Sequence, residues 1–180
     1  MLQNYNKWKV LRVFFDNPNP KGSGLQLREI CRIVNISPPS VKNYLKQLKK
    51  EELIVETKHR IHGYPVYFAN RDNDNFRFLK KTDMTIRIKE SGLLDYINDE
   101  CMPDAVVLFG SASKGEDLAE SDVDIFVKSK EIKMMKLEKY EKQLKRKINI
   151  FFNSEFNKLS KELKNNILNG VILSGYFKVF

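Results

Sequence analysis

Two carboxylates and a glycine-serine turn are the residues of this chain whose types and spacing best fit chemistry. Gly110 and Ser111 follow the apolar run 106–109, and ten residues separate Ser111 from Asp122. Glycine lacks a Cβ, so its backbone can turn sharply and approach a ligand. Serine offers a hydroxyl and a backbone N–H to phosphate oxygens. The pattern predicts a phosphate-binding turn ahead of Asp122 and Asp124.

The two aspartates enter a second apolar run, 123–127, which we interpret as a strand. Successive strand side chains point to opposite faces, so Asp122 and Asp124 share a face. Carboxylates this close repel unless a cation lies between them. Mg²⁺ is usually held by one or two carboxylates together with substrate phosphates. A pair of metal ions can activate the attacking oxygen and stabilise the leaving pyrophosphate. We expect both residues to be catalytic and to bind Mg²⁺ or Mn²⁺, with ATP or another NTP as substrate.

The segment between the two motifs is polar, and residues 113–115 read as a loop. Asp-x-Asp alone is usually a solvated strand end, and Gly-Ser alone is an ordinary turn. Their joint occurrence around an apolar strand favours a nucleotide site. The expected nucleotide-binding residues are Gly110, Ser111, Ser113, Lys114 and Ser121.

This segment resembles the signature of the DNA polymerase β-like nucleotidyltransferases, in particular the minimal nucleotidyltransferases of archaea and bacteria. Their pattern of Gly-Ser, about ten residues and Asp-x-Asp matches Gly110, Ser111, Asp122 and Asp124. The resemblance runs from about Leu93 to Tyr176. It implies a mixed sheet flanked by helices, Mg²⁺, and transfer of a nucleoside monophosphate from a triphosphate to a hydroxyl.

One position departs from that family. Many active members carry a third carboxylate on the next strand, and the equivalent place in 147–152 is Asn149. An amide is neither an anionic ligand nor a proton acceptor for the attacking hydroxyl. Three explanations stay open: two carboxylates suffice, Glu116 or Asp117 substitutes, or the domain binds nucleotide without turning it over.

Charge is concentrated at the start of the chain. The 180 residues carry a net charge of +9, and residues 1–70 hold 12 Lys+Arg against 5 Asp+Glu, a net of +7. Residues 71–180 hold 20 against 18, a net of +2. A concentrated basic half suggests a polyanion partner.

Several features bear on location. There is no 18-residue apolar run, so we expect no membrane span. The first residues lack the apolar region of a signal peptide. Cys31 and Cys101 lack metal-type spacing. We therefore expect a cytoplasmic, reducing setting.

The basic half has the pattern of a helical DNA-binding domain. Helical spacing of apolar residues covers 5–15, 25–34 and 40–50, with Ser37 as the expected N-cap of the third helix. Residues 53–55 and 65–68 read as a β-hairpin. The pattern resembles a winged helix-turn-helix over roughly residues 5–69. The predicted fold class is α/β (α+β), with this domain preceding a nucleotidyltransferase-like mixed sheet flanked by helices.

In winged helix-turn-helix proteins the second helix of the pair enters the major groove. Here that helix is 40–50, and the wing lies near His59. The expected DNA-binding residues are Ser40, Lys42, Asn43, Lys46, Gln47, Lys58 and Arg60. The alternative is a winged helix that contacts protein, with its lysines merely solvated.

The predicted domains are 1–70, a linker and connecting helix over 71–92, and 93–180. Within the last, we expect a lysine-rich helix over 131–147, with Ile132, Met135, Tyr140 and Leu144 facing inward. Its lysines are most simply a solvated face, although they could also attract RNA or an acidic protein.

Three functions fit these patterns. The first is a nucleotidyltransferase coupled to DNA binding. Its likeness to minimal nucleotidyltransferases implies an antitoxin role with a HEPN-type toxin partner, and a homodimer is compatible with it. The second is a transcriptional regulator whose degenerate nucleotidyltransferase domain senses nucleotide, which Asn149 favours. The third is an interaction module, which leaves Asp122 and Asp124 unexplained.

Overall fold

The computed structural model describes residues 5–18, 24–131 and 133–177. Its internal contacts divide the chain into two units, Met1–Lys80 and Lys81–Phe180. The boundary lies inside helix α4 (Asp74–Glu90), which occupies most of the predicted connecting segment. The predicted limits at 70 and 92 remain predictions.

No helix in the described part of the chain is both long and apolar enough to cross a membrane.

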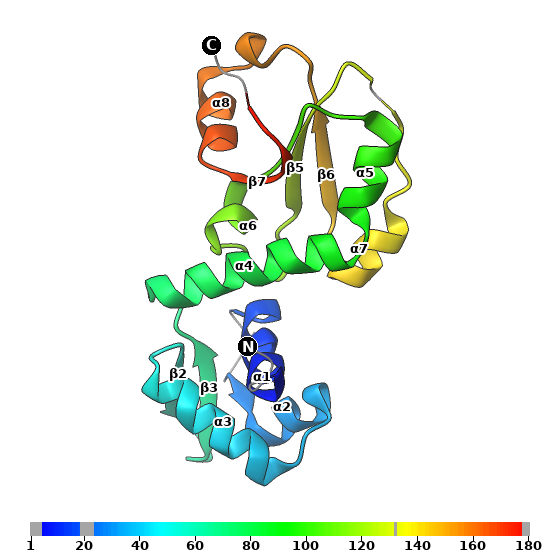
Figure 1. The fold of residues 1–180 in the computed structure, drawn as a ribbon. Helices are drawn as coiled ribbons and strands as arrows, with labels where there is room; N and C mark the ends of the chain where they lie inside the picture. Colours follow the sequence, from blue (N-terminus) through cyan, green and yellow to red (C-terminus); the bar gives the residue numbers. More distant parts are fainter. Residues whose placement is uncertain (1–4, 19–23, 132, 178–180) are drawn as a thin grey trace. The chain divides into compact units, whose positions relative to one another are not determined.

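The first unit is a small helical bundle with a hairpin (Figure 1). Its three-stranded antiparallel sheet has the order β1-β3-β2. The helices enclose a core around Phe14, Ile30 and Leu45. The elements are α1 (Tyr5–Asp16), β1 (Leu25–Gln26), α2 (Leu27–Val34), α3 (Pro38–Lys50), β2 (Ile54–Lys58) and β3 (Pro65–Ala69).

The expected helix 25–34 is wrong in its first two residues. Leu25 pairs with Tyr67 of β3, and Gln26 with Val66, so both belong to a short strand. The helix begins at Leu27, where the Gln26 N–H donates to the Glu29 carboxylate at 3.3 Å in a capping box. Pairing with a strand forty residues away overrides the local helical pattern.

The start of α3 follows the expected pattern of a proline-led helix. Ser37 is at the N-cap, and its hydroxyl donates to Ser40 Oγ at 3.1 Å. Pro38 and Pro39 take the first helical turn, where a missing N–H costs nothing. Val41 and Leu48 are completely buried, so the opposite face of the helix is left to solvent.

The second unit contains a four-stranded mixed sheet of order β6-β5-β4-β7. The pair β5–β6 is parallel, whereas β4–β5 and β4–β7 are antiparallel. This confirms the predicted mixed sheet. After α4 come α5 (Leu93–Cys101), β4 (Ala105–Phe109), α6 (Gly110–Lys114), β5 (Val123–Lys128), α7 (Glu138–Leu144), β6 (Ile148–Phe152), the 3₁₀ helix η2 (Phe156–Lys158), α8 (Lys161–Leu168) and β7 (Val171–Gly175).

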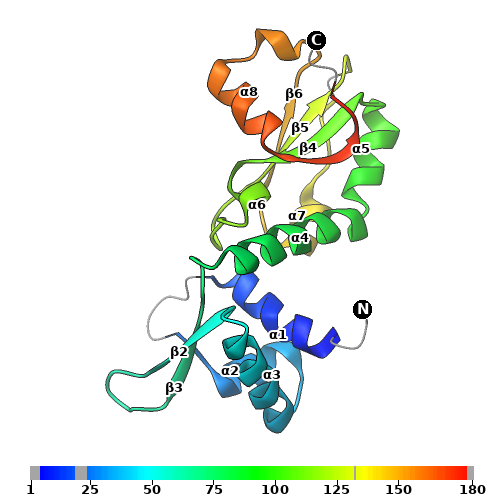
Figure 2. The same cartoon turned by 60° about the vertical axis from the view of Figure 1, so that its left-hand side comes forward.

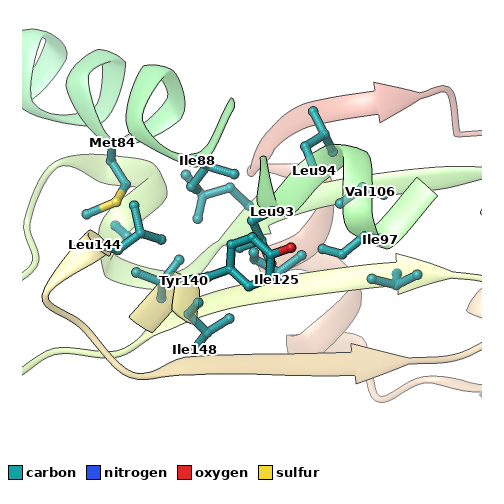
Figure 3. Close-up of a cluster of buried hydrophobic side chains, with 14 of the residues drawn as sticks. Met84, Ile88, Leu93, Leu94, Ile97, Val106, Ile125, Tyr140, Leu144 and Ile148 are labelled. Carbon is teal, nitrogen blue, oxygen red and sulfur yellow. The ribbon is translucent and has the colours of Figure 1, made fainter. Parts of the chain in front are cut away.

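The two faces of this sheet have separate cores. On one face, side chains from α4, α5 and α7, such as Ile88, Ile97 and Leu144, pack on Ile125 (Figure 3). On the other face, α8 and η2 cover Val107, Phe109 and Phe126 through Ile167 and Phe156. Figures 1 and 2 show α5 and α8 on opposite sides of the strands. Asp124 has the same strand parity as Phe126, so it lies on the α8 face.

Two further expectations about this unit are wrong. Ser113 and Lys114 belong to the short helix α6 (Gly110–Lys114), so the expected polar loop at 113–115 is wrong for these two residues. The lysine-rich helix covers only Glu138–Leu144 of the expected 131–147, and Ile132 is outside the described residues. Met135 and Leu137 still pack against the core on the α5 face of the sheet, but from a non-helical segment. Tertiary packing here overrides a favourable helix composition.

Candidate nucleotide site and nucleic-acid interface

The Gly-Ser turn and the Asp-x-Asp motif meet through the pairing of β4 with β5. Phe109, the last residue of β4, is opposite Asp124. Gly110 therefore lies beside the Asp124 carboxylate, with φ at +72°. A Cβ at Gly110 would lie 2.6 Å from Asp124 Oδ2. Glycine is required at this position for two reasons. Its backbone has a positive φ, and the nearby carboxylate leaves no room for a Cβ.

The carboxylates of Asp122 and Asp124 converge on one nitrogen. The Asn149 amide donates to Asp122 Oδ2 and to Asp124 Oδ1, each at 3.1 Å. Parallel pairing of β5 with β6 puts Asn149 directly beside Asp124, so the predicted position of this residue agrees with the register. An amide –NH₂ supplies two donors, and it occupies the point where a shared cation would relieve the repulsion of the two anions.

The residue types fit a divalent cation, because two neighbouring carboxylates are ligands that Mg²⁺ uses together with substrate phosphates. The Asn149 nitrogen fills the point on which Asp122 Oδ2 and Asp124 Oδ1 converge, so a cation would bind through the other carboxylate oxygens or displace the amide. Within the described residues, no three His, Cys, Asp or Glu side chains gather closely enough to hold a metal ion alone. The remaining ligands would therefore come from the nucleotide or from water.

The other expected nucleotide-binding residues differ in their placement. Ser111 is half-buried and Lys114 is exposed, so both remain accessible on α6. Ser113 is buried, and its hydroxyl donates to the Gly110 carbonyl at 2.8 Å. The Ser121 hydroxyl accepts from the Leu118 N–H at 2.8 Å. The hydroxyls of Ser113 and Ser121 thus shape the turn and the loop, and their contact with nucleotide stays a prediction.

The two acids considered as substitutes for a third carboxylate differ in their placement. Asp117 is only 2% exposed, and its Oδ2 lies 3.9 Å from Nη2 of the buried Arg146. A carboxylate in such a buried ion pair is not available to a cation on the α8 face. Glu116 is exposed, and its N–H closes α6 by donating to the Ser111 carbonyl at 3.0 Å.

Sequence reasoning missed one residue on the face of Asn149, Phe151, which is 43% exposed. Period-two alternation along β6 would have placed it there. Lys147 precedes β6, and its Nζ lies 3.7 Å from Glu141 Oε2 of α7. The exposure of Phe151 could not be predicted, because it depends on where α8 and η2 end.

In the first unit, the predicted DNA-contacting residues gather on one face of α3. Lys42, Asn43 and Lys46 are exposed, and Ser40 and Gln47 are half-buried. A groove of about 440 Å³ runs between α3 and the hairpin and is lined by Lys42, Asn43, Lys46, Lys49 and Tyr67, among others. Burial, and secondarily the Glu56 carboxylate, raises the pKa of Tyr67, so its phenol stays neutral at physiological pH.

The wing tip carries the remaining predicted contacts. Lys58 ends β2, and Lys58 and Arg60 are exposed. The turn is closed by the His59 N–H, which donates to the Tyr64 carbonyl at 2.8 Å. The rings of His59 and Tyr64 stack with centroids 4.6 Å apart, which gives the tip a defined shape.

Comparison with sequence families identifies both parts of the chain. Residues 92–175 match the family described as Polymerase beta, Nucleotidyltransferase, and residues 3–55 match the family described as Winged helix-turn-helix DNA-binding. The C-terminal part is thus a nucleotidyltransferase domain of the polymerase β class. The chain as a whole is a fusion of a winged helix-turn-helix domain with that domain, as the resemblance implied. No curated protein and no solved structure gives a significant match.

Gly110→Ala is expected to weaken the binding of magnesium nucleotide by at least about tenfold, since a methyl group would displace the Asp124 carboxylate. Isothermal titration calorimetry with ATP and Mg²⁺ measures the change. Gly92→Ala is the matched control, because Gly92 also has a positive φ (+79°) but its Cβ would meet open space. Equal loss of affinity in both variants would attribute the effect to backbone strain and contradict the prediction.

Proposed function

We propose that the C-terminal domain transfers a nucleoside monophosphate, AMP from ATP, to a hydroxyl of a protein or another acceptor. The observation that carries the proposal is the close approach of Gly110 to Asp124, with the Asp122 carboxylate held beside it through the shared Asn149 amide. A turn with a free backbone beside a converging carboxylate pair is the arrangement that a metal-bound triphosphate needs.

Each residue of the site has a separate proposed role. The Gly110–Ser111 backbone and the Ser111 hydroxyl hold phosphate oxygens, and Lys114 adds a positive charge on the same short helix. Asp122 and Asp124 hold Mg²⁺ or Mn²⁺, which when bound stabilises the charge that develops on the phosphates. The carboxylates and the turn together orient the triphosphate for attack, which is the main requirement in phosphoryl transfer.

DNA binding through α3 and the wing belongs to the same proposal. The exposed Lys42 and Lys46 and the exposed wing residues Lys58 and Arg60 face solvent, and residues 1–70 carry most of the chain's excess positive charge. Phosphate contacts by such residues supply affinity, and Asn43 and Gln47 can read base edges. The first unit would then bring the nucleotidyltransferase domain to a DNA site.

The biological setting is proposed from family resemblance alone. Minimal nucleotidyltransferases suggest an antitoxin or transcription regulator in the cytoplasm, with a HEPN-type toxin as protein partner and a homodimer as the assembly. The fusion to a DNA-binding domain is compatible with autoregulation.

A second candidate function is a nucleotide sensor that regulates DNA binding without catalysis. The observation that favours it is the Asn149 amide, which holds both carboxylates in the place of a third acid. Asparagine cannot take the proton of an attacking hydroxyl. In this function the nucleotide binds as in the first, and only turnover is lost.

Catalysis is tested by incubating the protein with α-³²P-labelled ATP, Mg²⁺ and a cell extract cleared of small molecules. Transfer of label to a macromolecule is expected, and Asp124→Asn should reduce its rate by about a thousandfold, because a charged ligand is lost. Asp99→Asn, at an exposed acid on α5, is the control and should leave the rate unchanged. Tight ATP binding without transfer to any acceptor would favour the sensor and overturn the enzyme.

Asn149→Asp tests metal binding by the carboxylate pair, which both functions require. A third carboxylate beside Asp124 should lower the thermal midpoint of the second unit by about 5 °C without Mg²⁺, because the anions repel. Added Mg²⁺ should raise the midpoint more than in the wild type. Asn165→Asp, at an exposed residue of α8, adds the same charge as a control. A midpoint insensitive to Mg²⁺ would show that the carboxylates do not hold the cation.

Lys46→Ala is expected to weaken DNA binding and to reduce the slope of log K against log salt by about 0.9, the loss of one phosphate contact. Fluorescence anisotropy of a labelled duplex over a range of NaCl concentrations measures the slope. Lys89→Ala removes the same charge from an exposed residue of α4 and should leave the slope as it is. No binding by the intact protein at low salt would refute the DNA-binding proposal.

A further inference from the structure

The two aspartates of the site are held in different ways. Asp124 lies within β5 and is paired on both sides, with Phe109 of β4 and Asn149 of β6. Asp122 comes directly before β5, outside the paired register, although the Asn149 amide reaches its carboxylate. The backbone of Asp122, and with it the direction of its side chain, therefore depends on the loop 115–121 that leads into the strand.

The end of this loop is a closed turn. The Leu118 N–H donates to the Ser121 hydroxyl at 2.8 Å, and the Ser121 N–H donates to the Leu118 carbonyl at 3.2 Å. These two bonds join the ends of the turn, and Asp122 is the next residue along the chain. Asp117 comes directly before the turn and is buried. A contact that holds the Asp117 side chain thus holds the turn and, through it, Asp122.

Asp117 is held by Arg146, a buried cation in the turn between α7 and β6. Asp117 Oδ2 lies 3.9 Å from Arg146 Nη2, and the two side chains are only 3% and 5% exposed. Removal of one partner would leave a buried charge uncompensated, whereas an apolar pair of similar volume is often as stable as a buried ion pair. Stability alone therefore does not explain why charges are buried here. An ion pair supplies a direction that an apolar contact lacks.

The turn that carries Arg146 is itself fixed at several points. The Arg146 N–H donates to the Glu141 carbonyl at 3.2 Å, and its Nη1 donates to the Lys145 carbonyl at 3.0 Å. From α4, Arg87 Nη2 donates to the Leu144 carbonyl at 2.7 Å. Leu144 is buried in the core on the α5 face of the sheet (Figure 3). Arg146 therefore extends from an anchored base and can hold a loop in place.

We propose that Arg146 is a positioning residue of the nucleotide site, which acts through Asp117 to hold the Asp122 carboxylate where it binds the cation. This inference rests on the proposed function and adds a residue to its site. Arg146 touches neither nucleotide nor metal. When its contact with Asp117 is lost, the turn at 118–121 shifts, Asp122 moves away from the strand-paired Asp124, and magnesium nucleotide binds more weakly.

The main test replaces the ion pair by an apolar pair, Asp117→Leu with Arg146→Met, which leaves the net charge unchanged. The thermal midpoint should stay within about 3 °C of the wild type, because such apolar pairs are often as stable as the ion pair. The Mg²⁺ concentration that half-saturates ATP binding should rise by about tenfold, because the apolar contact does not orient the loop. Calorimetric titration of the full chain with ATP over a range of Mg²⁺ concentrations measures this requirement. A purely structural pair would leave it unchanged.

Three further variants complete the test. Arg146→Lys keeps a charge opposite Asp117 and should retain most of the affinity of the wild type for magnesium nucleotide. Asp117→Asn keeps the side-chain shape without the charge, and should raise the Mg²⁺ requirement even where the double variant does not fold. The matched control makes the same substitutions, Asp104→Leu with Lys128→Met, in an ion pair of 3.4 Å at the far end of β5. It should leave the Mg²⁺ requirement unchanged.

Hydrogen exchange follows the loop in the absence of nucleotide. In the variant with Asp117→Leu and Arg146→Met, the amides of residues 116–121 should exchange about tenfold faster than in the wild type, because the loop is no longer held. The amides of β4 should exchange as before. Mass spectrometry of peptides from the full chain measures both.

The outcomes distinguish this inference from the proposed function. Faster exchange of the loop together with a higher Mg²⁺ requirement supports the role of Arg146. A wild-type Mg²⁺ requirement in the double variant or in Asp117→Asn overturns that role and leaves the proposed function in place. A wild-type protein that binds no magnesium nucleotide overturns the proposed function, and hydrogen exchange then decides by itself whether Arg146 holds the loop.

Discussion

The close approach of Gly110 to the Asp124 carboxylate is the constraint on which the site depends. This approach follows from the antiparallel pairing of β4 and β5, which sets Phe109 opposite Asp124. Gly110 is the next residue along the chain, so its backbone lies beside the Asp124 carboxylate. A methyl group in that place would lie 2.6 Å from a carboxylate oxygen. The glycine is thus fixed by the same contact that puts the predicted phosphate-binding turn next to the two carboxylates predicted to bind metal.

A second interaction keeps this arrangement stable. Asp122 and Asp124 share one face and would repel each other without a positive partner. The Asn149 amide donates to both at 3.1 Å, because the parallel strand β6 sets it beside Asp124. The pair therefore has hydrogen-bond donors of its own, independent of any cation. A third carboxylate in the same place would add to the repulsion instead of relieving it.

The comparison of sequence with structure separates local from long-range effects. Local properties of the sequence predict part of the structure. Apolar runs predict the strands at 106–109 and 123–127, and strand parity predicts that Asn149 lies on the face of the two aspartates. Leu25 could not be assigned, because its partner Tyr67 is far along the chain. Likewise Met135 and Leu137 reach the core without a helix, since contacts from other elements decide their conformation. The exposure of Phe151 depends on the extent of α8 and η2, which no local pattern records.

The geometry also separates nucleotide binding from turnover. The residues proposed to hold phosphates, Gly110 and Ser111, follow β4, whereas Asn149 and Phe151 lie on β6, on the other side of Asp124. Under the proposed function, an amide in place of an acid at 149 changes the side from which an acceptor would be activated and the partner of both carboxylates, whereas the Gly110–Ser111 turn keeps the position set by the pairing of β4 with β5. Because β6 is an edge strand with one neighbour, its outer face can change without disturbing the pairing of β4 with β5. Under the proposed function, phosphate binding and acceptor chemistry would depend mainly on different strands, so the same fold could serve as a transferase or as a sensor.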